Sequence, residues 1–342
     1  MNDDPKGNYA EVNGLDMYYE VHGTGRPLVV LHGAYMTIGT MGPVVPALAE
    51  TRQVIAVELQ GHGHTADADR PLTYGQMADD VAALMDHLGL EDADVFGYSM
   101  GGGVALQVAI RHPEVVRKLV VASFSYTSDG MHSELLAMIP TMTPEIFAGS
   151  PLEEAYLQTA PNPEDFPTLV AKLKQLDMEP YAWPPEDIQG IAAPTLFVIG
   201  DSDAIRLEHA VELFRLLGGG VMGDLAGLPK SQLAVLPGTT HFVPPGSGVL
   251  DRALWLLPMI GEFLDAPMPE EEEGSDEQES DLPGELARPA RRALTGAGYV
   301  RLEQLTRLSG AEVLKLHGMG PKALDQIRRA LAAKGQSFAD ST

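Results

Sequence analysis

Ser99, His241 and an aspartate at position 201 or 203 are the residues whose types and order could carry out nucleophilic catalysis. Ser99 lies in the stretch FGYSMGGG at residues 96–103, where four glycines surround one hydroxyl. Glycine is costly within regular elements, so this cluster indicates that another group must come very close to the backbone. A hydroxyl is a weak nucleophile until a base removes its proton, and histidine is the usual base because it titrates near neutrality.

The pentapeptide Gly97–Gly101 matches the pattern G-x-S-x-G, with an apolar run before it and small helix-forming residues after it. That context predicts a sharp strand-to-helix turn in which Ser99 is exposed beside the first free N–H groups of a helix. Side chains at positions 97 and 101 would collide in such a turn. The alternative is a glycine-rich β–α turn with an incidental serine.

Of the ten histidines, His241 is the strongest candidate for the base. It follows the last predicted strand (232–236), and ligand sites of open α/β sheets gather at the carboxyl ends of strands. The alternative for His241 is a buried structural histidine. Asp201 and Asp203 both follow the preceding predicted strand, so either carboxylate could orient the imidazole.

The elements that must position these residues alternate along the chain. Short apolar runs typical of strands buried on both faces of a parallel sheet occur at residues 27–33, 52–61, 93–99, 117–123, 193–201 and 231–238. Helical patterns lie between them, such as residues 73–89 with one apolar face. Residues 9–25 alternate around Asn13-Gly14, which predicts an antiparallel hairpin at one edge. The alternation predicts a doubly wound α/β sheet.

Residues 125–190 interrupt this rhythm with helical patterns, several prolines and no strand pattern, and we expect a helical cap over one end of the sheet. Met131, Met138, Met142 and Met178 lie in this segment. Methionine adapts to irregular cavities, so these side chains would suit a medium-sized apolar substrate. They could equally belong to the core.

The chain resembles the α/β-hydrolase family over about residues 9–265. The resemblance rests on LHGA (31–34), QGHGHT (60–65), GYSMGG (97–102), GDSD (200–203) and GTTH (238–241), in the order of the family. It implies an α/β fold, namely an α/β-hydrolase sheet of mostly parallel strands with a helical cap. The serine, acid and histidine also follow one another in the family's order.

The same resemblance implies roles for particular residues. It favours Asp203 over Asp201 as the acid, with Asp201 shaping the turn. It implies that the backbone N–H groups of Ala34 and Met100 bind an oxyanion, with His32 supporting the loop of Ala34. His62 and His64 form an H-x-H pair without a recognisable third ligand, so we expect no metal.

The activity that follows from the resemblance is that of a serine hydrolase, which cleaves a carboxylic ester or related acyl bond through an acyl-enzyme. The expected partner is a small-molecule acyl substrate, and no metal or organic cofactor is implied. GYSMGG also occurs in cofactor-free perhydrolases, which leaves peroxyacid formation open as a side reaction. The alternative is a binding protein that retains a hydrolase scaffold and carries a C-terminal module for docking a nucleic acid or a protein.

Composition limits the class of protein. The chain has 342 residues, no cysteine and a net charge of −25, so disulfides and thiolate chemistry are excluded. No apolar run approaches the roughly 20 residues that span a bilayer, and the N-terminus is polar. We expect a cytoplasmic protein without a membrane contact. The composition predicts no particular oligomeric state.

Charge and pattern divide the chain into a hydrolase-like domain (1–266), an acidic disordered linker (267–285) and a helical domain (286–342). Residues 270–282 carry eight acids and no base, whereas residues 283–342 carry ten bases and five acids. An acidic binding tail is the alternative to the linker.

The C-terminal segment contains LHGMGPKALDQI, which resembles a helix-hairpin-helix element, and the whole segment resembles the C-terminal domain of the RNA polymerase alpha subunit. We expect a helix starting near Pro321. The resemblance predicts that Gly318, Gly320 and Lys322 contact a nucleic-acid phosphate. The alternative is a small helical module that docks a protein.

Overall fold

The computed structural model of the chain describes residues 7–269, 280–284, 286, 288–316 and 319–339. The chain divides into two compact units, Met1–Met268 and Pro269–Thr342. None of the helices in the described ranges is long and apolar enough to cross a bilayer.

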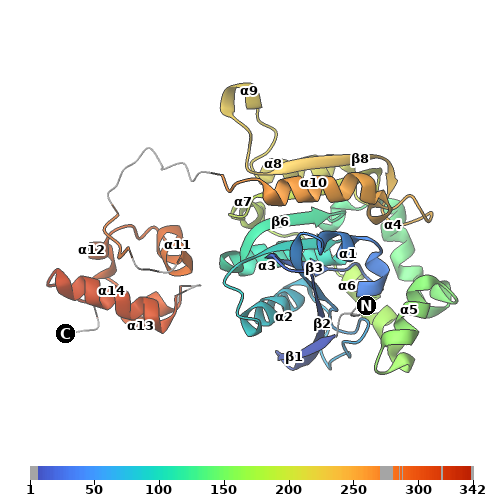
Figure 1. The fold of residues 1–342 in the computed structure, drawn as a ribbon, viewed down its shortest axis with the longest axis horizontal. Coiled ribbons are helices and arrows are strands. Elements are labelled where there is room, and N and C mark those ends of the chain that lie inside the picture. Colours follow the sequence, from blue (N-terminus) through green and yellow to red (C-terminus); the bar gives the residue numbers. More distant parts are fainter. Residues whose placement is uncertain (1–6, 270–279, 285, 287, 317–318, 340–342) are drawn as a thin grey trace. The chain divides into compact units, whose positions relative to one another are not determined.

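The first unit is built on one eight-stranded sheet in the order β1-β2-β4-β3-β5-β6-β7-β8 (Figure 1). Strands β1 and β2 are antiparallel to each other, β2 is antiparallel to β4, and all other neighbours are parallel. The strands are β1 (Asn8–Val12), β2 (Leu15–His22), β3 (Arg26–Leu31), β4 (Arg52–Val57), β5 (Ala93–Tyr98), β6 (Val116–Ala122), β7 (Thr195–Ser202) and β8 (Gln232–Thr240).

Helices connect the strands and form the cap. The α-helices of this unit are α1 (Val44–Leu48), α2 (Tyr74–His87), α3 (Met100–Arg111), α4 (Ser133–Met138), α5 (Pro151–Thr159), α6 (Phe166–Met178), α7 (Pro185–Gln189), α8 (Leu207–Leu216), α9 (Gly223–Ala226) and α10 (Ala253–Asp265). The 3-10 helices are η1 (Ile38–Met41), η2 (Pro113–Val115), η3 (Ser128–Gly130), η4 (Ile139–Thr141), η5 (Pro144–Phe147), η6 (Pro163–Asp165) and η7 (Val249–Arg252).

Successive residues of the central strands face opposite sides of the sheet and enter two separate cores. Val29 and Leu31 of β3 belong to the core that contains α2, α3 and α8, whereas Leu28 and Val30 belong to the core that contains α1 and α10. Side chains alternate across a strand, so a strand buried on both faces must be apolar throughout. The continuous apolar runs of the sequence are explained by this arrangement.

The predicted mostly parallel sheet with an antiparallel hairpin at its edge is confirmed. Asn13 and Gly14 both have positive φ, as a tight hairpin turn between β1 and β2 requires. Strand β8 differs from the expectation of burial on both faces, because it is the edge strand and several of its residues are exposed. Strand β4 ends at Val57 rather than 61, since Gly61 and Gly63 adopt positive φ in the loop that follows.

The segment between β6 and β7 forms the cap, whose helices α4, α5 and α6 lie beyond the strands at the right of Figure 1. Helix α6 has an apolar face of Leu169, Val170 and Leu173, which joins the same core as α2 and α3. The cap therefore packs as part of the unit rather than as a separate layer.

The second unit contains α11 (Arg288–Gly296), α12 (Leu302–Leu305), α13 (Gly310–Leu314) and α14 (Pro321–Ala333). Its described residues have an apolar core of their own, which includes Leu294, Leu305, Val313 and Ile327. Ser309 and Glu312 form a capping box at the start of α13. Helix α14 begins at Pro321, as the sequence predicts. Most of the predicted linker, residues 270–279 and 285, lies outside the described residues.

Candidate active site

Ser99 occupies the turn between β5, which ends at Tyr98, and α3, which begins at Met100. Its φ of 53° and ψ of −122° are strained for a residue with a side chain. Hydrogen bonds on both sides fix this conformation: the Ser99 N–H donates to the Ala122 carbonyl at 2.8 Å, and its own carbonyl accepts from the Gly102 N–H at 2.7 Å. The predicted sharp strand-to-helix turn is therefore present.

The glycines on either side of Ser99 leave no room for side chains. A Cβ added at Gly97 would lie 2.1 Å from the Gly101 carbonyl oxygen, and one at Gly101 would lie 2.4 Å from the Leu31 carbonyl oxygen. Backbone atoms cannot move aside as a flexible side chain can. The prediction that side chains at positions 97 and 101 would collide is confirmed, and the glycines allow α3 to start directly beneath the serine.

Ser99, His241 and Asp203 form one hydrogen-bonded chain. Ser99 Oγ lies 2.9 Å from His241 Nε2, and His241 Nδ1 lies 2.8 Å from Asp203 Oδ1. The three side chains come from the turn after β5, the loop after β8 and the turn after β7, which meet at the carboxyl edge of the sheet. This arrangement can transfer a proton from the hydroxyl to the imidazole while the carboxylate fixes the ring.

The Asp203 carboxylate is buried, with 5% of the residue exposed. Burial alone raises its pKa, but hydrogen bonds from His241, from the Ser123 hydroxyl and from the Gly200 N–H outweigh burial and hold the pKa below its usual value. A carboxylate that stays ionised can hold the imidazole in one tautomer and stabilise its protonated form.

Asp203 and His241 are each held by a further hydrogen bond that the sequence did not reveal. Ser123, which follows β6 and has a φ of 57°, donates to Asp203 Oδ2 at 2.6 Å. The Tyr98 hydroxyl donates to the His241 carbonyl at 2.6 Å, and the two rings stack with centroids 5.5 Å apart. A small hydroxyl residue directly after a buried strand is the one signal that could have pointed to Ser123.

Asp201 has a different role from Asp203. Its two carboxylate oxygens accept hydrogen bonds from the Gly238 N–H at 2.8 Å and the Thr239 N–H at 3.1 Å. These bonds lower its pKa and hold the β8 backbone just before His241. Asp201 therefore shapes the turn, and it is Asp203 that contacts the imidazole.

Ala34 and Met100 both line the cavity that contains Ser99. Met100 is the first residue of α3, whose N–H has no partner within the helix. Within the described part of the chain, neither the Ala34 N–H nor the Met100 N–H donates a hydrogen bond. Both are thus available to an oxygen atom bound beside Ser99.

Two buried histidines hold the loop that carries Ala34. His32 Nδ1 donates to the Gly33 carbonyl at 2.8 Å, while its Nε2 accepts from the Leu59 N–H. His62 Nε2 accepts from the N–H of Tyr35, a residue with a φ of 63°. Burial lowers the pKa of His32 to about 4 and that of His62 to about 3. Both rings are therefore neutral and serve as structural braces.

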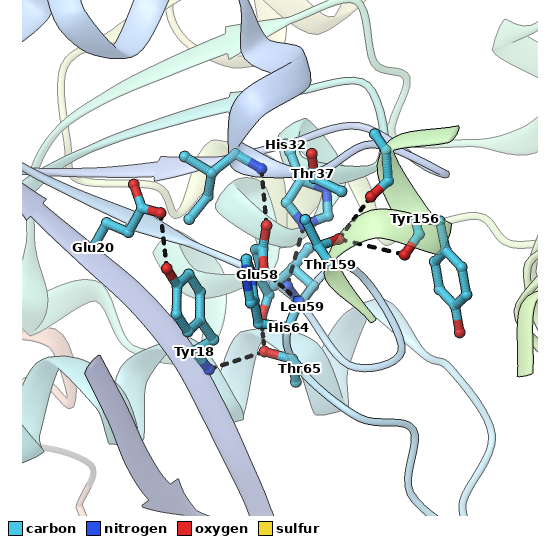
Figure 2. A network of polar contacts seen from close by, with 12 residues as sticks. Tyr18, Glu20, His32, Thr37, Glu58, Leu59, His64, Thr65, Tyr156 and Thr159 are labelled. Carbon is cyan, nitrogen blue, oxygen red and sulfur yellow. Dashed lines mark hydrogen bonds and ion pairs between the residues drawn. The ribbon is translucent and has the colours of Figure 1, made fainter. Parts of the chain in front are cut away.

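Glu58 adds further hydrogen bonds that hold the same loops. Figure 2 shows His32, Glu58 and His64 with their partners. The buried Glu58 carboxylate accepts from the Ile38 N–H at 3.1 Å and from His64 Nδ1 at 2.8 Å. It thereby joins the loop after β3 to the loop after β4. With His62 bonded to backbone and His64 bonded to Glu58, the H-x-H pair has structural partners, and the described residues contain no group of three potential metal ligands.

A cavity of about 620 Å³ opens above Ser99, between the sheet edge and the cap. Met131, Met138 and Met142 of the cap line it, whereas Met178 does not. The lining is mainly apolar and aromatic, and its few polar groups include the Ser99 hydroxyl, the His241 imidazole and the Asp177 carboxyl. A space of this size and lining suits a small, largely apolar molecule.

The C-terminal positions that the sequence marked as phosphate contacts are only partly described. Gly318 lies outside the described residues, as does His317. Gly320 is the N-cap of α14, and Lys322 is exposed in its first turn. The contact of this turn with a phosphate stays a prediction.

The chain is similar in sequence to known proteins over part of its length. Residues 26–141 match the model of a family described as alpha/beta hydrolase fold. A putative carbamate hydrolase, RutD, of Azorhizobium caulinodans is 35% identical over 122 residues, which are 36% of this chain and 46% of that protein. The chain thus spans less than half the length of this curated relative.

Two solved structures show the same architecture over most of the chain. A meta-cleavage product hydrolase from Pseudomonas fluorescens IP01 aligns with a TM-score of 0.59 and 22% identity over 76% of this chain and 97% of its own. The carboxylesterase CesB from Bacillus subtilis aligns with a TM-score of 0.58 and 19% identity over 77% of this chain and 93% of its own. The chain has the α/β-hydrolase fold.

Proposed function

We propose that this chain is a serine hydrolase that cleaves a carboxylic ester, or a related acyl bond, through an acyl-enzyme. The observation that carries the proposal is the continuous hydrogen-bonded chain from Ser99 Oγ through His241 to the buried Asp203, at the floor of a mainly apolar cavity. A scaffold that only binds a ligand has no need of a base within reach of a strained serine.

In the proposed first step, His241 Nε2 takes the proton of Ser99 as Oγ attacks the ester carbonyl carbon. The carbonyl oxygen becomes an oxyanion between the N–H groups of Ala34 and Met100, both of which line the cavity without other partners among the described residues. His241 then gives its proton to the departing alcohol oxygen, and the acyl group stays on Ser99.

In the second step, water loses a proton to His241 and attacks the acyl carbon. The collapse of this intermediate returns a proton to Ser99 and releases a carboxylic acid. Asp203 stays ionised throughout and stabilises the imidazolium in both halves of the reaction. These steps use only side chains and backbone groups of this chain, without a metal or an organic cofactor.

An ester is the first choice of substrate because its alcohol departs more easily than the amine of an amide, and His241 can supply the one proton that the alcohol needs. The relatives are named for several bonds, since one is a putative carbamate hydrolase, one a meta-cleavage product hydrolase and one a carboxylesterase. Fold alone does not choose among them. Hydrogen peroxide in place of water in the second step would yield a peroxyacid as the side product.

A panel of 4-nitrophenyl esters of graded chain length tests this function. We expect the wild type to release nitrophenol fastest from acyl chains of moderate length, and Ser99→Ala to lose at least about a thousandfold of the rate. Equal rates for the two proteins would instead support a binding protein built on a hydrolase scaffold.

For the C-terminal unit, the earlier expectation of phosphate binding rests on one specific feature, the exposed Lys322 in the first turn of the 13-residue helix α14. We propose a weak, salt-dependent contact with a nucleic-acid backbone at this turn. A gel shift of the full chain with a short DNA duplex at low salt tests it, with Lys322→Glu as the variant. No shift would leave protein docking as the alternative for the unit, and an equal shift for both proteins would place the nucleic-acid contact elsewhere than at Lys322.

A further inference from the structure

The charged side chains that line the cavity are all acidic apart from two histidines. Glu134, Asp177 and Asp203 contribute carboxyl groups, and no lysine or arginine among the described residues lines the cavity. Asp203 has its partners in His241 and Ser123, and Glu134 lies in the exposed first turn of α4. Asp177 has neither the hydrogen-bond partners of Asp203 nor the solvent exposure of Glu134.

Asp177 belongs to helix α6 of the cap and lines the same cavity as Ser99. Within the described part of the chain, its carboxyl group has no hydrogen bond and no ion pair, although the side chain is partly buried. Two nearby cations of the same helix are engaged elsewhere: Lys172 pairs with Asp67, and Lys174 donates to the Pro140 carbonyl.

Burial raises the pKa of Asp177 to about 6, so the group is mainly ionised at neutral pH although it lies in apolar surroundings. A partly buried charge without a protein partner is costly, and groups with perturbed pKa values cluster at functional sites. The carboxyl group is also close enough to His241 to interact with it electrostatically. One bound molecule can therefore contact Asp177 and reach Ser99 at the same time.

Aromatic rings accompany this carboxylate in the cavity wall. Tyr35 and Phe147 have ring centroids 4.4 Å apart, and Tyr74 and Phe124 have centroids 5.2 Å apart. All four residues line the cavity. Asp177 interacts electrostatically with both Tyr35 and Tyr74. The faces of such rings are electron-rich and attract cations.

Tyr35 supplies a second unsatisfied group. Only 7% of the residue is exposed, and its hydroxyl is buried without a hydrogen-bond partner in the described structure. A buried hydroxyl without a partner costs free energy that a bound ligand can recover. Together with Asp177, which interacts with it electrostatically, Tyr35 adds polar groups to a mainly apolar cavity lining.

We propose that Asp177 and the aromatic rings beside it bind a positively charged nitrogen of the substrate. The proposal rests on the hydrolase function proposed above and names the substrate class, an ester that carries an ammonium group. An anionic substrate would be repelled by the carboxylate, and a wholly apolar one would cover the carboxylate without giving it a partner. The acidic charge of the chain, −25 in total, favours the approach of cations as well.

Two pairs of esters of nearly equal shape test this assignment. Butyrylcholine is compared with 3,3-dimethylbutyl butyrate, which places the charge in the alcohol. The 4-nitrophenyl ester of 4-(trimethylammonio)butanoate is compared with that of 5,5-dimethylhexanoate, which places it in the acyl group. We expect the wild type to favour the cationic member of at least one pair by about tenfold or more in kcat/KM.

The variant Asp177→Asn tests whether this carboxylate is the cause. We expect the ratio of cationic to neutral kcat/KM to fall about tenfold or more in Asp177→Asn. Glu179→Gln is the matched control, because it removes one exposed negative charge just past the end of α6, outside the cavity lining, and should leave the ratio unchanged. A wild type without preference, or a ratio that Asp177→Asn does not alter, would overturn the proposal.

Binding to Ser99→Ala separates this proposal from the hydrolase function. Calorimetric titration with the same esters needs no catalysis, so it reports on the cation site even if no ester is cleaved. Tighter binding of a cationic ester than of its neutral partner, lost in the double variant with Asp177→Asn, supports the site. Equal binding of both members of each pair counts against it.

Discussion

Ser123 donates its hydroxyl proton to Asp203 on Oδ2, the carboxylate oxygen that does not face His241. The Oγ–Oδ2 distance is 2.6 Å, and both groups are buried. The carboxylate is thus held from both ends, by the imidazole at one oxygen and by Ser123 at the other. In the proposed mechanism, Ser123 is a positioning residue, because it acts on the reaction only through Asp203 and His241.

We predict that Ser123→Ala lowers kcat for a nitrophenyl ester about tenfold while KM changes little. Loss of the hydroxyl leaves the buried Asp203 with fewer donors, so the imidazole is less well oriented in the transition state. Steady-state kinetics give the split between kcat and KM. Ser125→Ala is the control, because Ser125 donates to the Thr127 carbonyl instead, and it should retain kcat. A rise in KM alone would contradict the positioning role.

The turn at Ser99 should tolerate no added methyl group. In Gly101→Ala, the new Cβ would lie 2.4 Å from the Leu31 carbonyl oxygen, so the start of α3 must shift against β3. We expect a loss of roughly 2 kcal/mol or more in the free energy of unfolding. Gly261→Ala in α10 is the control, because the new Cβ would meet no heavy atom within 4 Å beyond its chain neighbours and the backbone of its own helix. Urea denaturation should show this control unchanged or slightly more stable, and an equal loss in both variants would be evidence against the steric account.

The preference for a cationic ester should depend on pH through Asp177. Burial raises the pKa of this carboxyl to about 6, so it is protonated below that pH and charged above it. The groups in electrostatic contact with it are Tyr35, Tyr74, Tyr181 and His241. The pKa values of the three tyrosines are raised, so these residues stay neutral near pH 6. His241 is the base for both esters, so its part in catalysis is common to the two members of the ratio.

The ratio of kcat/KM for a cationic ester to that for its neutral partner should therefore fall as the pH drops through about 6, since kcat/KM reports ionisations of the free enzyme. In Asp177→Asn the ratio should stay flat over the same range. A wild-type ratio that rises on acidification would have the wrong sign for a carboxylate site.

The charge on Asp177 should also lower the free energy of unfolding. Its pKa is raised to about 6 in the folded chain, whereas an unfolded aspartate titrates near 3.9. The folded state is therefore penalised as the pH rises above the unfolded pKa, with the full penalty, at most about 3 kcal/mol, above pH 6. We predict that Asp177→Asn melts at a higher temperature than the wild type near pH 8, and that the gain shrinks near pH 5.

Asp80 provides the contrast. Its buried carboxylate accepts from Asn13, Arg70 and Gln76, so Asp80→Asn should lower the melting temperature. Destabilisation by both substitutions near pH 8 would show that the Asp177 carboxyl has a structural partner after all.

The sheet and the position of Ser99 followed from the sequence because local patterns determine them. Apolar runs buried on both faces predict the central strands, and the glycines around Ser99 predict the turn. The pairing of Ser99, His241 and Asp203 needed the order of the strands in the sheet. The number of residues between these three positions does not determine how close they lie in space. The sequence could therefore predict their contact only through a family resemblance.

Other parts of the site had no local signature. Ser123 and Asp177 are single residues whose partners are distant in the chain, and neither stands in a recognisable motif. The exposure of β8 depends on its place at the sheet edge, which its own apolar run does not encode. The partners of the side chains at the cavity thus depend on tertiary contacts, which local sequence patterns do not predict.

The central claim is that Ser99 carries the acyl group during the reaction. Rapid acid quench of the wild type with a 4-nitrophenyl ester, followed by peptide mapping by mass spectrometry, measures this directly. The account predicts an acyl adduct on the peptide that contains Ser99, and its absence in Ser99→Ala. Ester cleavage with the adduct on another residue, or at an equal rate in Ser99→Ala, would contradict it.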